Sequence, residues 1–456
     1  QRAIDARRGH VEFSFTLLAE VKDEAAVLKR FGKSDRVRPA PEETYRELPA
    51  APAPAPDRRV IIVGTGPCGL FCGLLLARAG WKPLLLERGK AAGDRARDVT
   101  GFWRRGWAFN PESNVQFGEG GAGTFSDGKL YTQIRDREHR IPWLLRELVA
   151  AGAPEDILVK ARPHIGTDRL IKVVRHVREE IIALGGEVRF EAKVTDLILE
   201  DSTLRGVVLA GGETLEASKV ILAVGHSARD TFEMLHRHRV PMEPKPFSVG
   251  VRIEHPQRVI DRARYGKWAG DPRLGSAPYK FVSHCGTGRA AYSFCMCPGG
   301  LVVAAASEPG GVVTNGMSSY ARAEANANSG FMVDVRPEDF GSPDGSDPLA
   351  GVRFQRRLEQ AAFQLGGSDF KAPAQRLGDF LAGEASTGPG KVEPSYQPGV
   401  VWTDLAQILP DYVTDTLRQA IPEIDRKLSG FAMEDAILTG VETRSSAPLR
   451  IPRDFE

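Results

Sequence analysis

Three glycines and one acid occupy the positions that a dinucleotide-binding turn requires. Gly64, Gly66 and Gly69 form a GxGxxG pattern directly after the apolar run VIIV, and Glu87 ends the next apolar run. In such a turn the first glycine permits the bend, the second admits a diphosphate, and the third lets helix and strand approach. The helix N-terminus then faces the negative charge, and the acid can accept hydrogen bonds from a ribose diol. We weigh this hypothesis above a turn without a ligand, because strand, helix and acid all fall where the pattern needs them.

A second glycine-rich stretch, NVQFGEGGAGTFSDGKLYTQ, covers residues 114–133. It lacks the many serines of a flexible linker and carries several large hydrophobic side chains. We therefore expect a rigid group to pack against its backbone. Our interpretation is that the flat ring of a flavin excludes side chains here. The loop from Gly118 to Gly128 is therefore predicted to flank such a ring.

The choice between FAD and NAD depends on the rest of the chain. A nicotinamide-dependent dehydrogenase begins with the same unit, but VILAVGHSARD, residues 220–230, resembles the Ala-Thr-Gly strand of glutathione-reductase-like flavoproteins. This favours FAD. A second glycine pattern, GTGRAA at residues 286–291, lies between two strand patterns and opens no helix, so we predict a hairpin turn there. Without a second βαβ unit no dedicated NAD(P)H domain is visible, and NAD(P)H stays a candidate electron donor.

Several long motifs resemble one family. GEGGAGTFSDGKLYT, VILAVGHSARDTFEML, KPFSVGVRIEHPQ, YSFCMCPGG and NGMSSYARAEANANSG are similar to motifs of a poorly characterised family of FAD-dependent dehydrogenases from bacteria and plastids. The resemblance also reaches IDAR near the start. It implies a glutathione-reductase-like FAD domain with an inserted substrate domain, and it names no physiological substrate. Similar members continue beyond TRSSAPLRIPRD, so we expect a truncated end at Glu456, with FAD retention by this form left open.

The fingerprint and the resemblance together give a set of candidate cofactor-binding residues. They are Gly64, Gly66, Pro67, Gly69, Glu87, Arg88, Arg95, Gly120, Gly121, Gly123, Thr124, Val194, Ala223 and Gly225.

Candidate catalytic residues are fewer, because a flavin carries the electrons itself. Lys129 follows the glycine loop and would stabilise negative charge near a reduced ring, although a lysine that solvates the loop exit explains it equally well. Asp127 is expected to fix the turn through backbone hydrogen bonds. His226 follows the strand at residues 220–225, where it either contacts the cofactor or orders the loop.

Cys295 and Cys297 would point to the same face of a strand, which suggests redox chemistry. The plainer interpretation is that both are small buried hydrophobic residues, and a disulfide across one residue is strained. No set of metal ligands is completed nearby, so we predict no metal site. Arg252 and Arg322 are candidates for holding an anionic substrate, with a solvated strand end as the alternative for Arg252.

The pattern of elements places these residues in an α/β protein. The fold class is a glutathione-reductase-like, Rossmann-type FAD domain with an inserted mixed-sheet substrate domain and a small N-terminal α+β module. Strands at residues 187–225 are expected to form a meander. The predicted divisions are a module at 1–49, a Pro/Ala linker at 50–58, the FAD domain at 59–242, the substrate domain at 243–345, and a mainly helical segment at 346–456 that returns to the FAD domain.

Composition sets the broad class. The 456 residues are 42% hydrophobic and 26% charged, with a net charge of +2, typical of a soluble globular protein. Interspersed charges argue against a nucleic-acid partner, and no apolar run approaches the length of a membrane span. Five cysteines suggest a reducing compartment, which is the cytoplasm in a prokaryote or the stroma in a photosynthetic eukaryote. Because the first residue is Gln1, the true start is expected to be missing.

These observations favour an FAD-dependent oxidoreductase with a small-molecule substrate. Two alternatives stay open: a catalytically quiet flavoprotein-fold scaffold or assembly factor, and a nicotinamide-only dehydrogenase. The N-terminal module is too small to bury much surface alone, so we expect it to dock on the main body or on a protein partner.

Overall fold

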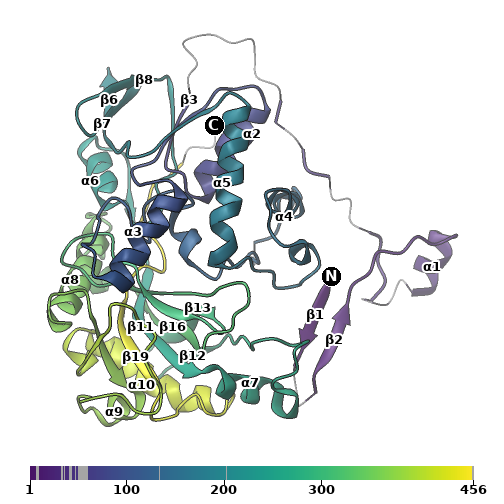
Figure 1. Cartoon of the computed structure of the whole chain (residues 1–456), viewed down its shortest axis with the longest axis vertical. Helices are drawn as coiled ribbons and strands as arrows, with labels where there is room; N and C mark the ends of the chain where they lie inside the picture. The colour runs from purple at the N-terminus through teal and green to yellow at the C-terminus, as the bar shows by residue number, and fades with distance from the viewer. Residues whose placement is uncertain are drawn as a thin grey trace.

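The computed structural model of the chain describes residues 1–6, 10–31, 34, 36–40, 44–46, 48–49, 60–132, 134–201 and 203–453. Figure 1 shows an upper part, coloured blue to teal, that contains the glycine turn, and a lower part, coloured teal to yellow, that is built around a larger sheet. The N-terminal strands lie at one side of both. The predicted linker at 50–58 lies outside the described residues, and the predicted domain limits stay predictions.

The glycine turn belongs to a four-stranded parallel sheet. Every residue of its strands β3 and β4 is buried, because the sheet is covered on both faces. Helix α2 connects these two strands, so the predicted βαβ unit is present. In spatial order the strands are β5 (Glu187–Arg189), β4 (Leu84–Leu86), β3 (Val60–Val63) and β9 (Lys219–Leu222), and the helix is α2 (Pro67–Arg78).

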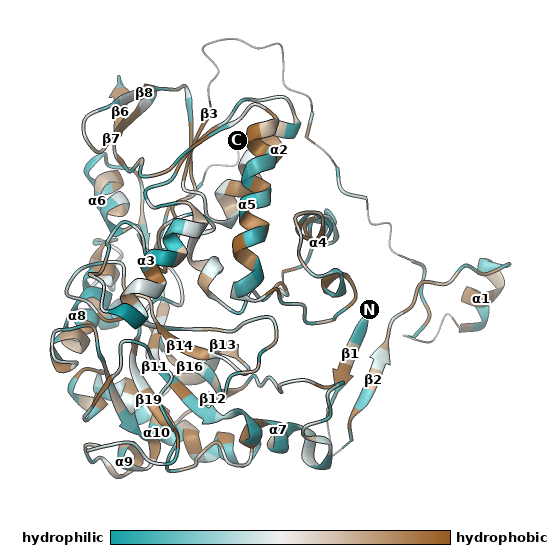
Figure 2. Cartoon of the chain, in the orientation of Figure 1, coloured by the Kyte–Doolittle hydropathy of each residue, from teal (hydrophilic) through white to brown (hydrophobic). Residues whose placement is uncertain are grey.

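The two faces of this sheet have different covers. Ile62 and Leu85 pack with apolar residues of α2 and α5 (Thr167–Ala183), and Figure 2 shows hydrophobic and hydrophilic residues alternating along α5. Ile61 and Leu84 point to the other face, as the strand period of two requires, and pack on a three-stranded sheet. That sheet is an antiparallel meander of β6 (Val194–Glu200), β7 (Thr203–Leu209) and β8 (Thr214–Glu216).

The predicted meander over residues 187–225 was therefore wrong at both ends. β5 and β9 belong to the parallel sheet instead, where β9 pairs with β3 and β5 pairs with β4. The alternation of apolar residues does not reveal which sheet a short strand joins, because that depends on partners far away in the sequence.

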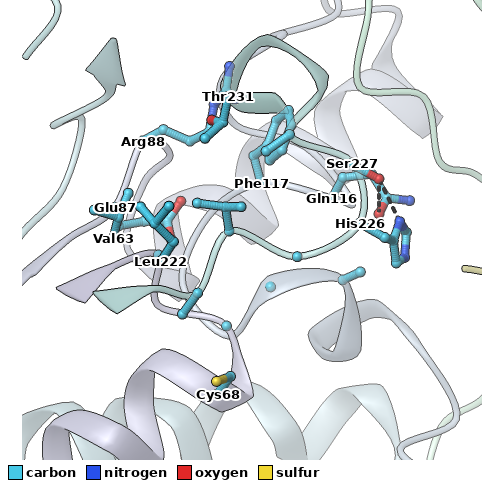
Figure 3. Close-up of a pocket in the computed structure, with 18 of the residues that line it drawn as sticks. Val63, Cys68, Glu87, Arg88, Gln116, Phe117, Leu222, His226, Ser227 and Thr231 are labelled. Atoms are coloured by element: carbon cyan, nitrogen blue, oxygen red, sulfur yellow. Dashed lines mark hydrogen bonds between the residues drawn. The ribbon is translucent and has the colours of Figure 1, made fainter. Parts of the chain in front are cut away.

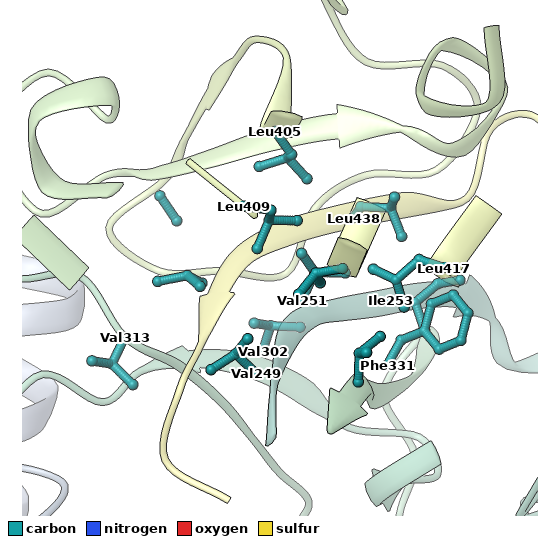
Figure 4. Packing of buried hydrophobic residues seen from close by; sticks show 14 of the residues in the cluster. Val249, Val251, Ile253, Val302, Val313, Phe331, Leu405, Leu409, Leu417 and Leu438 are labelled. Carbon is teal, nitrogen blue, oxygen red and sulfur yellow. The ribbon is translucent and has the colours of Figure 1, made fainter. Parts of the chain in front are cut away.

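A seven-stranded sheet forms the centre of the lower part. Its central strand β11 pairs with β16 on one side and β19 on the other, both antiparallel. Figure 4 shows the core that this sheet shares with the surrounding helices, including Val251, Phe331, Leu417 and Leu438. The strands in order are β12 (Val282–His284), β13 (Ala290–Cys297), β16 (Asn326–Val335), β11 (Phe247–Pro256), β19 (Ile437–Glu442), β17 (Ala372–Arg376) and β18 (Val400–Trp402).

The segment 346–456 is less helical than predicted. It supplies α8 (Ala350–Leu365), α9 (Leu377–Ala382) and α10 (Asp411–Asp425). It also supplies β17, β18 and β19, and β19 lies beside the central strand. Each of these strands is short, and periodicity alone does not separate such runs from loops or helix ends.

The remaining elements connect these sheets. The predicted hairpin at residues 286–291 is confirmed: it joins β12 to β13, and the backbone N–H of Cys285 donates to the carbonyl of Arg289 at 2.9 Å. Among the described residues no helix is both long and apolar enough to cross a membrane. The other elements are α3 (Ala92–Arg105), α4 (Arg140–Ala150), α6 (Arg229–Arg237), α7 (Gln257–Tyr265), β10 (Glu243–Pro244), β14 (Leu301–Ala304), β15 (Thr314–Met317) and β20 (Leu449–Arg450).

The N-terminal residues form a two-stranded hairpin and a short helix. Strands β1 (Arg2–Asp5) and β2 (Glu12–Phe15) pair antiparallel, and α1 (Glu24–Phe31) has no buried residue. One contact with the rest of the chain is a backbone hydrogen bond from Arg2 N to Val159 O at 2.6 Å. The predicted docking of this module on the main body is thus seen at the edge of β1.

Candidate functional site

A cavity of about 550 Å³ lies at the carboxyl ends of β3, β4 and β9. Ligands bind at this edge in open α/β sheets, and the volume is in the usual range for small-molecule sites. Figure 3 shows some of the residues that line it, among them Glu87, Phe117 and His226. The lining includes the turn at Gly64, Gly66 and Pro67, the strand end at Glu87 and Arg88, the loop residues 116–118 and 121–123, the segment 222–228, and Ala447, Leu449 and Ile451.

The glycine turn has the geometry that its spacing predicts. Gly64 has φ +103, and a Cβ there would lie 2.5 Å from the carbonyl oxygen of Ala223. A Cβ on Gly69 would lie 1.9 Å from the carbonyl oxygen of Gly64, so helix and strand meet too closely for any side chain. Gly66 differs, because a Cβ there would meet nothing nearer than the Cα of Gly121 at 3.8 Å. Protein packing therefore does not require glycine at position 66, whereas an approaching ligand would.

The N-terminus of α2 carries no side-chain cap. Gly66 is its N-cap and Pro67 its first residue, and among the described residues no side-chain cap hydrogen bond is made there. Such unsatisfied donors, together with the helix dipole, form a site for a phosphate group. The arrangement of residues here fits the diphosphate of a dinucleotide.

Glu87 braces the turn against the glycine-rich loop. Its Oε2 accepts from the N–H and hydroxyl of Thr65 at 2.9 and 2.8 Å, and its Oε1 accepts from the N–H groups of Gly89 and Gly118 at 2.9 and 3.0 Å. The side chain lines the cavity but is only 4% exposed. A ribose diol would therefore share these oxygens with backbone donors, and the ribose contact stays a prediction.

Arg95 was predicted to bind the cofactor, but it does not line the cavity. It is fully buried, and its guanidinium donates to the carbonyls of Asn114, Val115, Gly118 and Glu119 at 2.7 to 3.2 Å. Burial lowers the pKa of Arg95 to about 10, although Glu87 and Glu119 oppose this shift. Arg95 thus holds the glycine-rich loop in shape from behind.

These contacts of Arg95 change the explanation of the loop's glycines. A Cβ on Gly118 would clash with the Arg95 side chain, one on Gly120 would lie 2.1 Å from Thr124 Oγ1, and one on Gly128 would lie 3.1 Å from Gly166 N. The interpretation that a flavin ring excludes these side chains was wrong at these three positions, because the protein's own atoms fill the space. Gly118, Gly121 and Gly123 all line the cavity, and of these Gly123, where a Cβ would meet nothing nearer than Pro67 Cγ at 3.8 Å, keeps that role open.

Paired charges border the cavity beside Phe117. Arg88 donates to Glu112 at 2.6 Å and to Asp230 at 2.9 Å, and its guanidinium lies 3.9 Å from the Phe117 ring centre. Lys193 contacts the same two carboxylates at 2.9 and 2.8 Å. Against burial, the hydrogen bonds from Arg88 and Lys193 lower the pKa of Asp230 to about 2. The network is ionised at neutral pH and fixes Arg88 flat against the aromatic ring.

His226 lines the cavity at the end of the strand at residues 219–222. Its Nδ1 lies 2.9 Å from Ser227 Oγ, and that hydroxyl donates to Gln116 Oε1 at 3.2 Å. Since the hydroxyl has one proton, Nδ1 is the donor to Ser227 and the ring is in the Nδ1–H form. Burial, with Arg444 and Arg229 nearby, lowers the pKa of His226 to about 4, so the ring is neutral at pH 7.

The other predicted catalytic and substrate residues lie away from this cavity's lining. Arg322 donates to both carboxylate oxygens of Asp127, at 2.8 and 2.5 Å, so it ties the loop to the segment before β16. Arg252 is fully buried and ion-paired with Glu442. The expectation of a free arginine fork for an anionic substrate was wrong for both. Lys129 is beside Cys297 rather than at the cavity, so its predicted place near a flavin ring is not supported.

The cavity brings together most of the predicted cofactor set and several residues that the sequence did not indicate. Gly64, Gly66, Pro67, Glu87, Arg88, Gly121, Gly123, Val194, Ala223 and Gly225 line it, as does His226, whereas Gly69, Arg95, Gly120 and Thr124 do not. Missed lining residues include Gln116, Phe117, Lys193, Ser227, Thr231 and Phe232. Ala447, Leu449 and Ile451 were also missed, since no local motif links the end of the chain to the turn at residue 64.

Comparisons with known families agree with this geometry. Residues 246–445 match the family described as FAD-dependent protein, C-terminal domain-like, and residues 57–100 match an FAD binding domain. An uncharacterized protein of Clostridium beijerinckii is 46% identical over 458 residues, which cover 100% of this chain and 84% of the relative. The fold and the two family matches together show the class of protein, a flavoprotein with a Rossmann-type FAD-binding fold. Within that class, the chain belongs to the family of FAD-dependent proteins that shares this C-terminal domain.

Solved structures show a more distant likeness. The GidA-related protein from Thermus thermophilus is 16% identical with a TM-score of 0.26, over 42% of this chain and 73% of its own. Halogenase PltM is 13% identical with a TM-score of 0.35, over 62% and 52%. L-proline dehydrogenase from P. horikoshii is 12% identical with a TM-score of 0.29, over 64% and 72%. These scores are too low to bear on the function of this chain.

Proposed function

We propose that the chain is an FAD-dependent oxidoreductase that acts on a small molecule. The main observation in support of this proposal is the cavity at the carboxyl ends of the parallel strands, next to the uncapped N-terminus of α2. The family match to an FAD binding domain supports FAD over a nicotinamide as the resident cofactor.

The residues around the cavity supply binding and orientation. First-turn N–H groups of α2 would hold the diphosphate, and Glu87 with Thr65 would hold the adjacent ribose. The backbone at 121–123 and 225–227 would border the rest of the cofactor. When bound, FAD supplies two-electron redox chemistry, which the protein itself cannot.

His226 offers the cavity a neutral base. Its Nδ1–H is committed to Ser227, so Nε2 is the ring nitrogen that is free to accept a proton. Because burial, together with the charges of Arg444 and Arg229, lowers its pKa, the ring stays neutral over the physiological range. In this proposal, His226 orients a substrate or cofactor group by hydrogen bonding rather than by charge.

The electron donor and the substrate class follow from what the chain has around this cavity. The sequence gives no second dinucleotide unit, so a reduced nicotinamide would have to bind transiently, next to the bound FAD. We therefore expect NADH or NADPH to act as a diffusible donor and a small organic molecule as the oxidised or reduced substrate.

The test starts with the cofactor and then asks for turnover. Full-length protein is purified natively, denatured, and the released small molecules are identified by mass spectrometry; FAD is expected. Anaerobic addition of NADH or NADPH should then bleach the bound flavin's absorbance, and added acceptors should restore it. Released NAD(P) without FAD would overturn the proposal in favour of a nicotinamide-only dehydrogenase. FAD that no reductant bleaches would favour the scaffold hypothesis.

A further inference from the structure

A second cluster of reactive groups lies away from the cavity, where β13 meets the loop that follows residue 125. Cys295 and Cys297 end β13, and Lys129 Nζ lies 4.0 Å from the Cys297 sulfur. The same ammonium lies 3.3 Å from Asp127. Of the two cysteines, Cys297 is fully buried and Cys295 is partly exposed. Cys295 is therefore the more exposed residue of the pair.

The strand is distorted where the two cysteines lie. The pairing of β13 with β16 shifts register between Phe294 and Cys297, and Cys295 has φ +42. In a regular strand the Cα atoms of residues i and i+2 are about 6.7 Å apart, at the limit for a disulfide. A bulge with a left-handed residue bends the strand and breaks this regular spacing. The Cys297 thiol donates to the Cys295 carbonyl at 3.2 Å, so the two residues contact one another at the bulge.

Two cations, Lys129 and Arg252, lie beside the cysteine pair. The guanidinium of Arg252 donates to the Cys295 carbonyl at 2.9 Å. The hydrogen bond with Cys297, followed by the charges of Lys129 and Arg252, lowers the pKa of Cys295 against burial and against Asp127. The same hydrogen bond, with burial, raises the pKa of Cys297. A thiolate beside a thiol is the arrangement that thiol redox centres use.

We propose that Cys295 and Cys297 form a two-thiol centre that reduces small hydroperoxides, with Cys295 as the attacking thiolate, Cys297 as the second thiol and Lys129 as the cation beside the pair. This activity is separate from the flavin chemistry proposed above, because it uses the two sulfurs alone. It also gives a use to the buried Lys129, which the cavity does not.

The chemistry balances in two steps. The Cys295 thiolate attacks one oxygen of the hydroperoxide, the O–O bond breaks, a sulfenic acid forms on Cys295, and the leaving alkoxide or hydroxide takes a proton. The Cys297 sulfur then attacks the sulfenic sulfur, an S–S bond forms, and the thiol proton leaves with the hydroxyl as water. The two cysteines lose two electrons in total and the peroxide gains them. A dithiol reductant restores both thiols by exchange.

The limited exposure of the centre selects for small oxidants. Cys295 is only partly exposed and Cys297 is sheltered, so a protein disulfide would not reach the attacking sulfur in line. Hydrogen peroxide or a small alkyl hydroperoxide would. Lys129 would also stabilise the negative charge that develops on the leaving oxygen.

The first test uses the full chain with and without its flavin. Equimolar hydrogen peroxide should remove two of the five free thiols, with a mass loss of about 2 Da that maps to residues 295–297 and is reversed by dithiothreitol. In Cys297→Ser, a dimedone adduct should accumulate on Cys295. An adduct on Cys297 in Cys295→Ser, or no mass loss in the native chain at equimolar peroxide, would overturn the proposal. Since no flavin is needed, failure here would leave the flavin function standing.

The second test addresses Lys129. Iodoacetamide should alkylate Cys295 in the native chain at least tenfold faster at pH 7 than Cys285, a partly buried thiol whose pKa is raised by burial. Lys129→Met should slow that reaction about tenfold and shift its pH profile upward. Lys371→Met, on an exposed lysine paired with Asp369, should leave it unchanged. If Cys295 and Cys285 react alike in the native protein, the proposal fails even if the lysine variant does not fold.

Discussion

Gly118 lies directly against the side chain of Arg95, so that a Cβ on the glycine would be 2.3 Å from the arginine Cδ. The glycine-rich loop is folded around a buried arginine that satisfies four of its carbonyls. Its shape is therefore set by protein contacts before any cofactor arrives. This is the kind of preorganisation that a rigid cofactor site needs.

Replacing Arg95 with methionine should destabilise the protein strongly. The substitution leaves four buried carbonyls without their donor and removes the cation that faces Glu87 and Glu119. We expect the free energy of unfolding to fall by about 3–5 kcal/mol, with lower FAD content, measured by urea denaturation and cofactor release. Arg97→Met is the matched control on the same helix, since Arg97 is exposed and pairs only with the exposed Asp94 among the described contacts. A similar loss of stability in both variants would contradict the role of Arg95 in holding the loop.

The Arg252–Glu442 pair should be structural. Arg252→Met leaves the Glu442 carboxylate buried without its cation, which costs about 3–5 kcal/mol. Glu442→Gln should cost less, because burial already raises the pKa of Glu442 to about 7 against the effect of Arg252. Thermal unfolding of the two variants measures both effects, with the exposed Arg273→Met as control. If Arg252→Met kept full stability and lost only substrate affinity, the original assignment as a substrate arginine would be restored.

The low pKa of His226 predicts how stability depends on pH. Its pKa is lowered from 6.5 to about 4 in the folded protein, so between these values the unfolded chain binds more protons than the folded one. Stability should therefore rise as pH increases from 4 to 6.5, and this histidine contributes up to about 2–3 kcal/mol of that rise. His226→Gln should flatten the profile of melting temperature against pH in this window.

Two other histidines, His284 and His255, provide comparisons for that measurement. His284 is exposed on β12, and His284→Gln should leave the profile unchanged. His255→Gln should flatten the profile like His226→Gln, because burial also lowers the pKa of His255 to about 4. Equal slopes for wild type and His226→Gln would show that the ring is not held neutral by its surroundings.

The parts of the fold that could be predicted are those with local signals. The βαβ unit could be predicted because its strand, glycine turn, helix and acid follow one another from residue 60 to 87. The hairpin at 286–291 could be predicted for the same reason. The sheets that β5, β9 and β19 join could not be predicted, since a strand of three to six residues carries no information about its partner.

The candidate site divides in the same way. The turn at Gly64 and Gly66 was found from spacing. The role of Arg95 was not, because an arginine near a dinucleotide turn is as readily a ligand contact as a clamp, and only the converging carbonyls decide. Lys193, just before β6, and Ala447, between β19 and β20, reach the cavity from segments far away in the sequence. The bulge at Cys295 and Cys297 depends on the register of β13 with β16.

The central claim is most directly tested by FAD affinity at position 66. Gly66 has φ −65, and a methyl there would meet no protein atom nearer than 3.8 Å, so Gly66→Ala should fold normally but place its methyl in the path of the diphosphate. Gly388→Ala is the matched control, since Gly388 has nothing within 4 Å. Titration of FAD into flavin-free protein should show at least a hundredfold weaker Kd for Gly66→Ala, about 2.7 kcal/mol, and no change for Gly388→Ala. Equal FAD affinity in the two variants and the wild type would contradict a cofactor in this cavity.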